Sequence, residues 1–135
     1  MTGIDVVHTV DELRHVVDRA ARAGLRVGLV PTMGALHDGH ASLVARAAAD
    51  NDVVIATVFV NPLQFAPTED LSAYPRTLAA DVELCAHHGA THVFAPSNDE
   101  MYPGPMYTTV SVVGVSERLE GASRPTHFAG VATVV

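Results

Sequence analysis

Apolar residues follow two alternating patterns along this chain. Three short stretches are almost continuously apolar and rich in β-branched residues, which is typical of strands buried on both faces of a sheet. They span residues 26–30, 53–60 and 91–94. Ahead of them, apolar residues recur with helical spacing over about residues 10–23, 39–49 and 78–88. Helices that alternate with strands in this way predict right-handed crossovers and an α/β fold, a parallel sheet with helices on both faces.

Capping residues mark the ends of two of these helices. Thr9 and Glu12 have the spacing of a capping box, and Gly24 is suited to the end of the helix that follows. Thr77 is a candidate N-cap for the helix that ends near Gly89.

The last third of the chain gives weaker signals. Residues 95–105 contain three prolines and a glycine and are expected to form a loop. Residues 108–113 have a β-like pattern, and residues 116–119 suit a short helix. The valine-rich residues 128–135 are compatible with either a helix or a strand. Because no repeat or linker interrupts the chain, we expect residues 1–135 to form one domain.

Composition excludes several classes of protein. The 135 residues carry a net charge of −7 without a basic cluster, which argues against a nucleic-acid partner. The longest largely apolar run is far shorter than the roughly 20 residues that span a bilayer, and the N-terminus lacks a signal pattern, so no membrane partner is expected. The single cysteine, Cys85, cannot form an internal disulfide, which is typical of a reducing cytoplasm.

The clearest chemical signal is the sequence Pro-Thr-Met-Gly-Ala-Leu-His-Asp-Gly-His at residues 31–40. It links the first predicted strand to the next helix. Backbone N–H groups at a helix start lack partners inside the helix, and the helix dipole favours an anion there, so the position suits a phosphate. His37 and His40 would add hydrogen-bond donors beside it. If protonated, His40 could also donate a proton to phosphate oxygens.

Other interpretations of this segment remain open. Gly34 and Gly39 have the spacing of a P-loop, but His40 and Ala41 replace the Lys and Ser/Thr that a P-loop requires. His37, His40 and Asp38 could bind zinc, although no CxxC or HExxH pattern supplies further ligands. The histidines could also be plain surface residues, since the chain contains eight.

A second polar loop follows the strand at residues 53–60. Asn61 and Gln64 could bind a polar substrate in an apolar pocket, or Asn61 could form an Asx turn with Gln64 exposed. Tyr74 and Arg76 come later in this loop, and the local alternative is that Tyr74 packs and Arg76 is solvated. Both loops leave the carboxyl ends of consecutive strands, so they could face one crevice.

Several motifs resemble one known family. His-Asp-Gly-His at residues 37–40 resembles the HxGH signature of the nucleotidyltransferase superfamily, and the longer segment 31–40 resembles the pantoate–β-alanine ligase family. Further blocks match that family in order: FVNPLQF at 59–65, EDLSAYPR at 69–76, MYP at 101–103, LEG at 119–121 and RPTHFAGV at 124–131.

The resemblance implies a Rossmann-like fold and an ATP-dependent ligase that joins pantoate to β-alanine through pantoyl adenylate, as a homodimer. His37 and His40 would be catalytic. ATP would be wrapped by residues 33–40, namely Met33, Gly34, Ala35, Leu36, His37, Asp38, Gly39 and His40. Gln64 would bind pantoate near β-alanine, and Asn61 and Tyr74 would line the β-alanine or phosphate side. Asp81 would contact Mg²⁺.

The chain also departs from the family pattern. Family members are much longer, and a GxKDxQ-like block, an MSxRN-like block and the small C-terminal lid domain are missing here. We therefore expect a fragment of the nucleotide-binding domain that is truncated before the lid and is a poor catalyst alone. Two alternatives remain: another HxGH nucleotidyltransferase, which the blocks at 59–65 and 124–131 disfavour, and a non-catalytic nucleotide-binding module.

Overall fold

The computed structural model describes residues 3–135, which form two compact units. The first comprises the chain up to residue 60 together with residues 75–101, and the second comprises residues 61–74 and 102–135. The interpretation of the whole chain as one domain stays a prediction.

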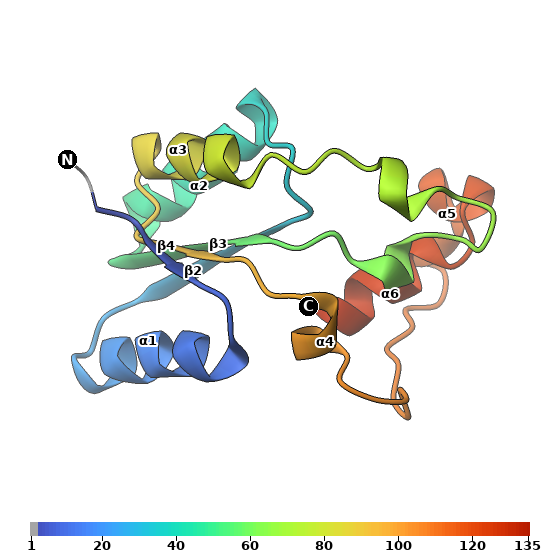
Figure 1. Cartoon of the computed structure of the whole chain (residues 1–135), viewed down its shortest axis with the longest axis horizontal. Coiled ribbons are helices and arrows are strands. Elements are labelled where there is room, and N and C mark those ends of the chain that lie inside the picture. Colours follow the sequence, from blue (N-terminus) through green and yellow to red (C-terminus); the bar gives the residue numbers. More distant parts are fainter. Residues whose placement is uncertain (1–2) are drawn as a thin grey trace. The chain divides into compact units, whose positions relative to one another are not determined.

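The first unit is built on a sheet of four parallel strands (Figure 1). In spatial order these strands are β1 (Asp5–Val7), β4 (His92–Phe94), β3 (Val53–Val58) and β2 (Val27–Thr32). In the register, Val27 pairs with Val53 and Ile55 pairs with His92. The sheet confirms the α/β prediction. The three-residue strand β1 was not predicted, because it is too short to show a pattern of its own.

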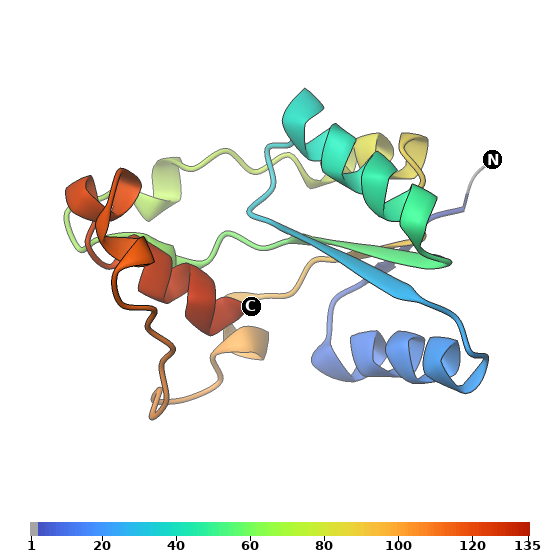
Figure 2. The ribbon, with the colours of Figure 1, turned by 180° about the vertical axis from the view of Figure 1, so that it is seen from behind.

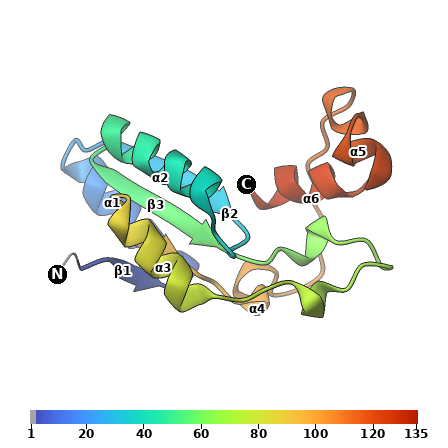
Figure 3. The same ribbon diagram turned by 90° about the horizontal axis from the view of Figure 1, so that it is seen from above.

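Helices cover both faces of this sheet. Helices α2 (Asp38–Asp50) and α3 (Leu78–His87) lie on one face, and α1 (Val10–Arg22) lies on the other (Figure 2). Seen from above, α2 and α3 lie on either side of β3 (Figure 3). Right-handed crossovers explain this arrangement, since the chain steps from β2 to β3 to β4 in one direction and from β1 to β2 in the opposite one.

The core has two layers, one on each face of the sheet. Residues of β3 supply both layers: Val54 and Ala56 pack under α2 and α3, whereas Ile55 packs against Val16 of α1. This burial from both sides explains the continuous apolar run in the sequence. Cys85 of α3 is fully buried in the first layer.

The predicted helix ends are confirmed in α1 and only partly in α3. The Thr9 hydroxyl accepts from the Glu12 N–H at 3.2 Å, and the Glu12 carboxylate accepts from the Thr9 N–H at 2.9 Å. Gly24 adopts the left-handed conformation, with φ of +69°. Thr77 directly precedes α3, but its side chain makes no capping bond to the helix backbone. Its hydroxyl donates instead to the Asp81 carboxylate at 3.2 Å.

The second unit consists of short helices and loops. Its helical elements are η1 (Pro62–Gln64), η2 (Leu71–Ala73), η3 (Val115–Glu117), α5 (Glu120–Ser123) and α6 (His127–Val134). The strand expected at residues 108–113 is wrong, since this segment is irregular and largely exposed. The ambiguous segment 128–135 is mostly helical. Gly130 allows α6 to pack tightly against η1, because a Cβ atom there would collide with the Leu63 carbonyl group.

The loop expected at residues 95–105 contains one short helix, α4 (Asn98–Met101), which belongs to the first unit. Within residues 3–135, none of the helices has the length and apolar character needed to cross a lipid bilayer.

Candidate functional site

The segment between β2 and α2 forms a tight loop at the carboxyl end of β2. Gly34 and Ala35 both adopt left-handed conformations, with φ of +82° and +51°. The Gly34 N–H donates to the Thr32 hydroxyl at 3.1 Å. Because His37 is the N-cap of α2, both histidines of the motif lie at a helix start, as the sequence predicts.

The two histidines cap the helix through their Nδ1 atoms. His37 Nδ1 accepts from the Gly39 N–H at 3.0 Å, and His40 Nδ1 accepts from the His37 N–H at 3.3 Å. A backbone N–H can only donate, so each Nδ1 must lack a proton. The neutral rings therefore carry their hydrogen on Nε2. The ring centroids lie 4.2 Å apart, so two imidazoles that can donate through Nε2 adjoin at the helix N-terminus.

The charge state of His40 follows from its surroundings. Burial lowers the pKa of His40 below its ordinary value of 6.5, and His37 lowers the pKa further, whereas Asp81 opposes the change. His40 is therefore a neutral hydrogen-bond donor near pH 7. This state weakens the hypothesis of a protonated His40 that acts as an acid.

Asp81 reaches the loop from α3. Its Oδ2 accepts from the Ala35 N–H at 3.0 Å, and its Oδ1 accepts from the Leu36 N–H at 2.8 Å. With the Thr77 hydroxyl on Oδ2 as well, the carboxylate is almost fully enclosed, at 3% exposure. Among residues 3–135, no group of three or more His, Cys, Asp or Glu side chains could hold a metal ion.

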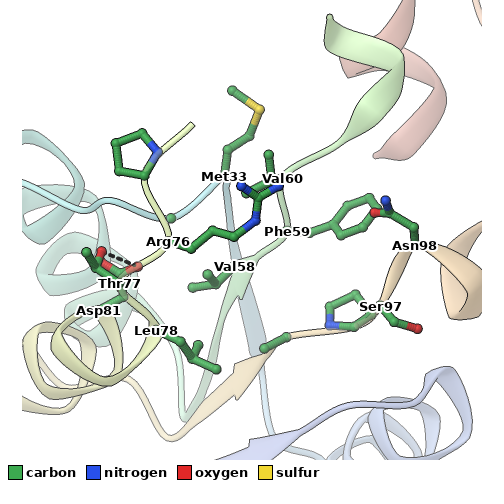
Figure 4. A pocket seen from close by; sticks show the side chains of 14 residues that line it. Met33, Val58, Phe59, Val60, Arg76, Thr77, Leu78, Asp81, Ser97 and Asn98 are labelled. Carbon is green, nitrogen blue, oxygen red and sulfur yellow. Dashed lines mark hydrogen bonds between the residues drawn. The ribbon is translucent and has the colours of Figure 1, made fainter. Parts of the chain in front are cut away.

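A pocket of about 310 Å³ opens beside the loop, at the carboxyl ends of β2, β3 and β4 (Figure 4). Met33, Gly34 and Asp81 contribute to the lining, together with residues 58–60, 75–78 and 95–98. Arg76 is the one basic residue in this lining, and Figure 4 labels it among the residues that surround the pocket. The pocket combines an apolar wall with a few polar groups, which is typical of a small-molecule site.

In the second unit, Asn61 is at the centre of a buried network. Its Oδ1 accepts from the Leu63 N–H at 3.2 Å and from the Tyr102 hydroxyl at 2.8 Å. Its Nδ2 donates to Gln64 Oε1 at 3.0 Å and to the Gly130 carbonyl at 3.1 Å. The Asx-turn interpretation of Asn61 is therefore confirmed.

This network also fixes the orientation of the Gln64 amide. The Leu63 N–H and the Gly130 carbonyl identify which end of the Asn61 amide is oxygen and which is nitrogen. The atom of Gln64 that faces Asn61 Nδ2 must then be Oε1, so Gln64 Nε2 remains as a donor outside the network. Gln64 is buried, and the expectation that it is exposed is wrong.

The family model of pantoate-beta-alanine ligase matches residues 5–135. The chain belongs to the pantoate–β-alanine ligase family. It is 56% identical to the pantothenate synthetase of Rhizobium etli over 130 residues, which is 96% of this chain and 44% of that protein. It is 58% identical to that of Pseudomonas fluorescens over 134 residues, covering 98% of this chain and 47% of that protein. The chain spans less than half the length of these curated relatives.

Solved structures of this ligase family share the fold. Pantothenate synthetase from Thermus thermophilus matches with a TM-score of 0.87 at 50% identity, over 97% of this chain and 46% of that one. The ligase from Francisella tularensis, complexed with beta-gamma ATP and β-alanine, matches with a TM-score of 0.87 at 36% identity. That match covers 98% of this chain and 51% of the Francisella chain.

The ligase-family residues predicted as a site fall into two groups. Residues 33–40 and Asp81 come together in the first unit, whereas Asn61, Gln64 and Tyr74 lie in the second. Tyr74 packs edge-on against Phe65, with centroids 5.8 Å apart, as the local alternative expects. A crevice shared by both loops stays a prediction.

Sequence reasoning missed two residues of the ligase fold that support the second group. Arg124 forms an ion pair with Glu69, with Nε 2.7 Å from Oε1, and its Nη2 donates to the Gln64 carbonyl at 2.9 Å. Tyr102 holds Asn61, as described above. These contacts join segments at least 41 residues apart in the chain, so no local pattern could have indicated them.

Proposed function

We propose that this chain supplies the ATP-binding part of a ligase that joins pantoate to β-alanine. One observation carries the proposal: the imidazole rings of His37 and His40 adjoin at the N-terminus of α2, with both Nδ1 atoms engaged and both Nε2 atoms left to donate. A helix start with added donors suits a phosphate group. The Francisella relative, whose complex contains an ATP analogue and β-alanine, supports this substrate class.

The proposed reaction has two steps. A carboxylate oxygen of pantoate attacks the α-phosphorus of ATP, and the bond to pyrophosphate breaks, which forms pantoyl adenylate. The amine of β-alanine then attacks the acyl carbon, and AMP leaves as the amide forms. Negative charge grows on the phosphate oxygens during the first step, and preorganised donors such as the two imidazoles stabilise it.

Gln64 is the proposed contact to pantoate. Because its Oε1 is held by Asn61, the group that Gln64 offers is Nε2–H₂, a donor. Its partner on the substrate must then be an acceptor, which a carboxylate or hydroxyl oxygen provides. Asn61 is already occupied by four partners in the second unit and is better suited to orient Gln64 than to contact substrate.

Magnesium is expected to arrive with the nucleotide. Mg²⁺ keeps several waters and is commonly bound by phosphates and only one or two carboxylates. A contact between Asp81 and Mg²⁺ stays a prediction, and the hydrogen bonds that enclose the Asp81 carboxylate disfavour it. A homodimer and a cytoplasmic location are proposed on the family resemblance, and light scattering of the purified chain tests the first.

A titration of the histidine ring signals by NMR tests the proposal. Adding ATP with magnesium is expected to shift the His37 and His40 signals in a saturable way. His15, which is exposed on α1 across the sheet from α2, is the internal reference. A variant with His37→Asn and His40→Asn should not bind. If the parent spectrum is folded and neither histidine responds to ATP, the proposal is wrong.

A further inference from the structure

Five backbone N–H groups between residues 34 and 39 are already used inside the protein. The N–H of Gly34 donates to Thr32, those of Ala35 and Leu36 donate to Asp81, that of His37 donates to His40, and that of Gly39 donates to His37. A loop that binds phosphate through its amides would leave such donors open. Here the Asp81 carboxylate accepts hydrogen bonds from the two central N–H groups, those of Ala35 and Leu36.

We propose that Asp81 is a positioning residue that holds this loop in its left-handed turn and thereby places His37 and His40, rather than a ligand of Mg²⁺. The inference rests on the proposed function only for the role of the two histidines. The carboxylate binds the loop through two hydrogen bonds, from the Ala35 N–H to Oδ2 and from the Leu36 N–H to Oδ1. Two contacts on one rigid group set both the distance and the orientation of the loop relative to α3.

Two neighbours fit this role. Thr77 lies one turn before Asp81, and its hydroxyl donates to Oδ2, which orients the carboxylate towards the loop. Gly34 gives the carboxylate room, since a Cβ atom there would lie 3.1 Å from Asp81 Oδ2 and 3.0 Å from Val58 Cγ1. Its φ of +82° is also a conformation that side-chain-bearing residues avoid.

The arrangement leaves little capacity for a metal. Oδ2 accepts two hydrogen bonds and Oδ1 accepts one, and the side chain is 3% exposed. A carboxylate offers about four acceptor positions, so a magnesium ion would share this group with three hydrogen bonds and would compete with the two part-buried amides. An anchor predicts that the loop depends on the Asp81 carboxylate even in the absence of any ligand.

Amide hydrogen exchange of the full 135-residue chain without nucleotide tests the anchor directly. We expect the Ala35 and Leu36 amides to be protected in the parent and to exchange about tenfold faster in Asp81→Asn, which loses the charge and one acceptor. Glu83→Gln is the matched control, because it removes one charge from an exposed position on the same helix. Unchanged protection in Asp81→Asn would overturn the proposal.

Thr77→Val provides a second, milder variant in case Asp81→Asn does not fold. The valine removes only the hydroxyl bond to Oδ2, so exchange should accelerate more at Ala35, which shares Oδ2, than at Leu36, which is bound by Oδ1. Equal rates in the parent and Thr77→Val at both amides would count against the anchor.

ATP titrations with magnesium and with a chelator separate the two roles of Asp81. A positioning residue predicts that Asp81→Asn weakens binding by a similar factor under both conditions. A metal ligand predicts a loss only when magnesium is present, and that result would overturn the proposal. If the parent binds no ATP at all, the proposed function fails, while the exchange data still decide whether Asp81 anchors the loop.

Discussion

The Nδ1 atom of His40 accepts a hydrogen bond from the backbone N–H of His37, at 3.3 Å. Together with the bond from the Gly39 N–H to His37 Nδ1, this contact makes the two histidines cap the same helix start. The His-x-Gly-His spacing follows from that geometry, since the first histidine is the N-cap and the second is the third residue of the helix. The same two bonds determine which ring nitrogen of each histidine faces outward.

Gly39→Ala is expected to impair ATP binding with little effect on stability. An added Cβ atom would lie 2.8 Å from His37 Cε1, so the imidazole must rotate away from its capping position. The ring is the mobile end of a side chain, and the fold can absorb the shift. Losing one charge-assisted hydrogen bond to phosphate should weaken binding by about tenfold or more, measurable by calorimetry.

Gly3→Ala is the control for that variant, because a Cβ atom at Gly3 meets nothing within 4 Å. Parent-like ATP affinity in Gly39→Ala would contradict the role given to the His37 ring.

Stability is expected to fall as the pH drops below about 6.5. The pKa of His40 is lowered in the folded protein, mainly by burial, and the pKa of His92 is lowered for the same reason. The unfolded chain therefore binds more protons than the folded one between those lowered values and 6.5. The stabilisation is complete above 6.5 and is lost as the pH falls through the folded values.

Urea unfolding at a series of pH values between about 7.5 and 5 measures this effect. His40→Gln should flatten the pH dependence and leave the part due to His92. A variant with the same slope as the parent would show that His40 does not contribute.

Asn61→Ala is expected to destabilise the second unit. The substitution removes four hydrogen bonds at a side chain that is 1% exposed and leaves partners such as the Gly130 carbonyl unsatisfied. A cost of about 1–3 kcal/mol in the free energy of unfolding is expected. Tyr102→Phe deletes only one of these bonds and should cost less. A smaller loss for Asn61→Ala than for Tyr102→Phe would be inconsistent with the network.

Turnover by this chain alone is expected to be far slower than that of a full-length relative. Departing pyrophosphate needs cationic support, and the chain contains no lysine. Arg76 is the one basic residue that lines the pocket. A coupled pyrophosphate-release assay with ATP, pantoate and β-alanine, run beside the Thermus enzyme, measures the difference. Comparable rates would refute the expectation.

Sequence reasoning succeeded where a local pattern has a local physical cause. The continuous apolarity of residues 53–58 reflects a strand that is covered on both faces, and the Thr9–Glu12 spacing reflects two reciprocal hydrogen bonds. The α/β fold followed from such signals, and the apolar patterns on either side of residues 31–40 placed His37 and His40 at a helix start.

Local patterns did not suffice where distant contacts decide the structure. The valine-rich segment that forms α6 suits a strand by propensity, but close packing of Gly130 against Leu63 favours a helix. Asp81 receives its hydrogen bonds from residues 45 and 46 positions earlier in the chain, which no local pattern shows. Only the family resemblance singled out Asp81, as a contact to Mg²⁺, and that contact stays a prediction.

Because Cys85 is buried, labelling of its thiol can be used to measure local opening of the first unit. Cys85 carries the chain's single thiol, and it is fully buried in the core. Burial raises the pKa of this thiol to about 11. The thiol is therefore inert to alkylating reagents while the first unit is closed. Its labelling rate then measures how often α3 separates from the sheet. Because Cys85 lies one turn after Asp81 on α3, a ligand that stabilises the loop should slow that labelling, and a simple mass shift would record it.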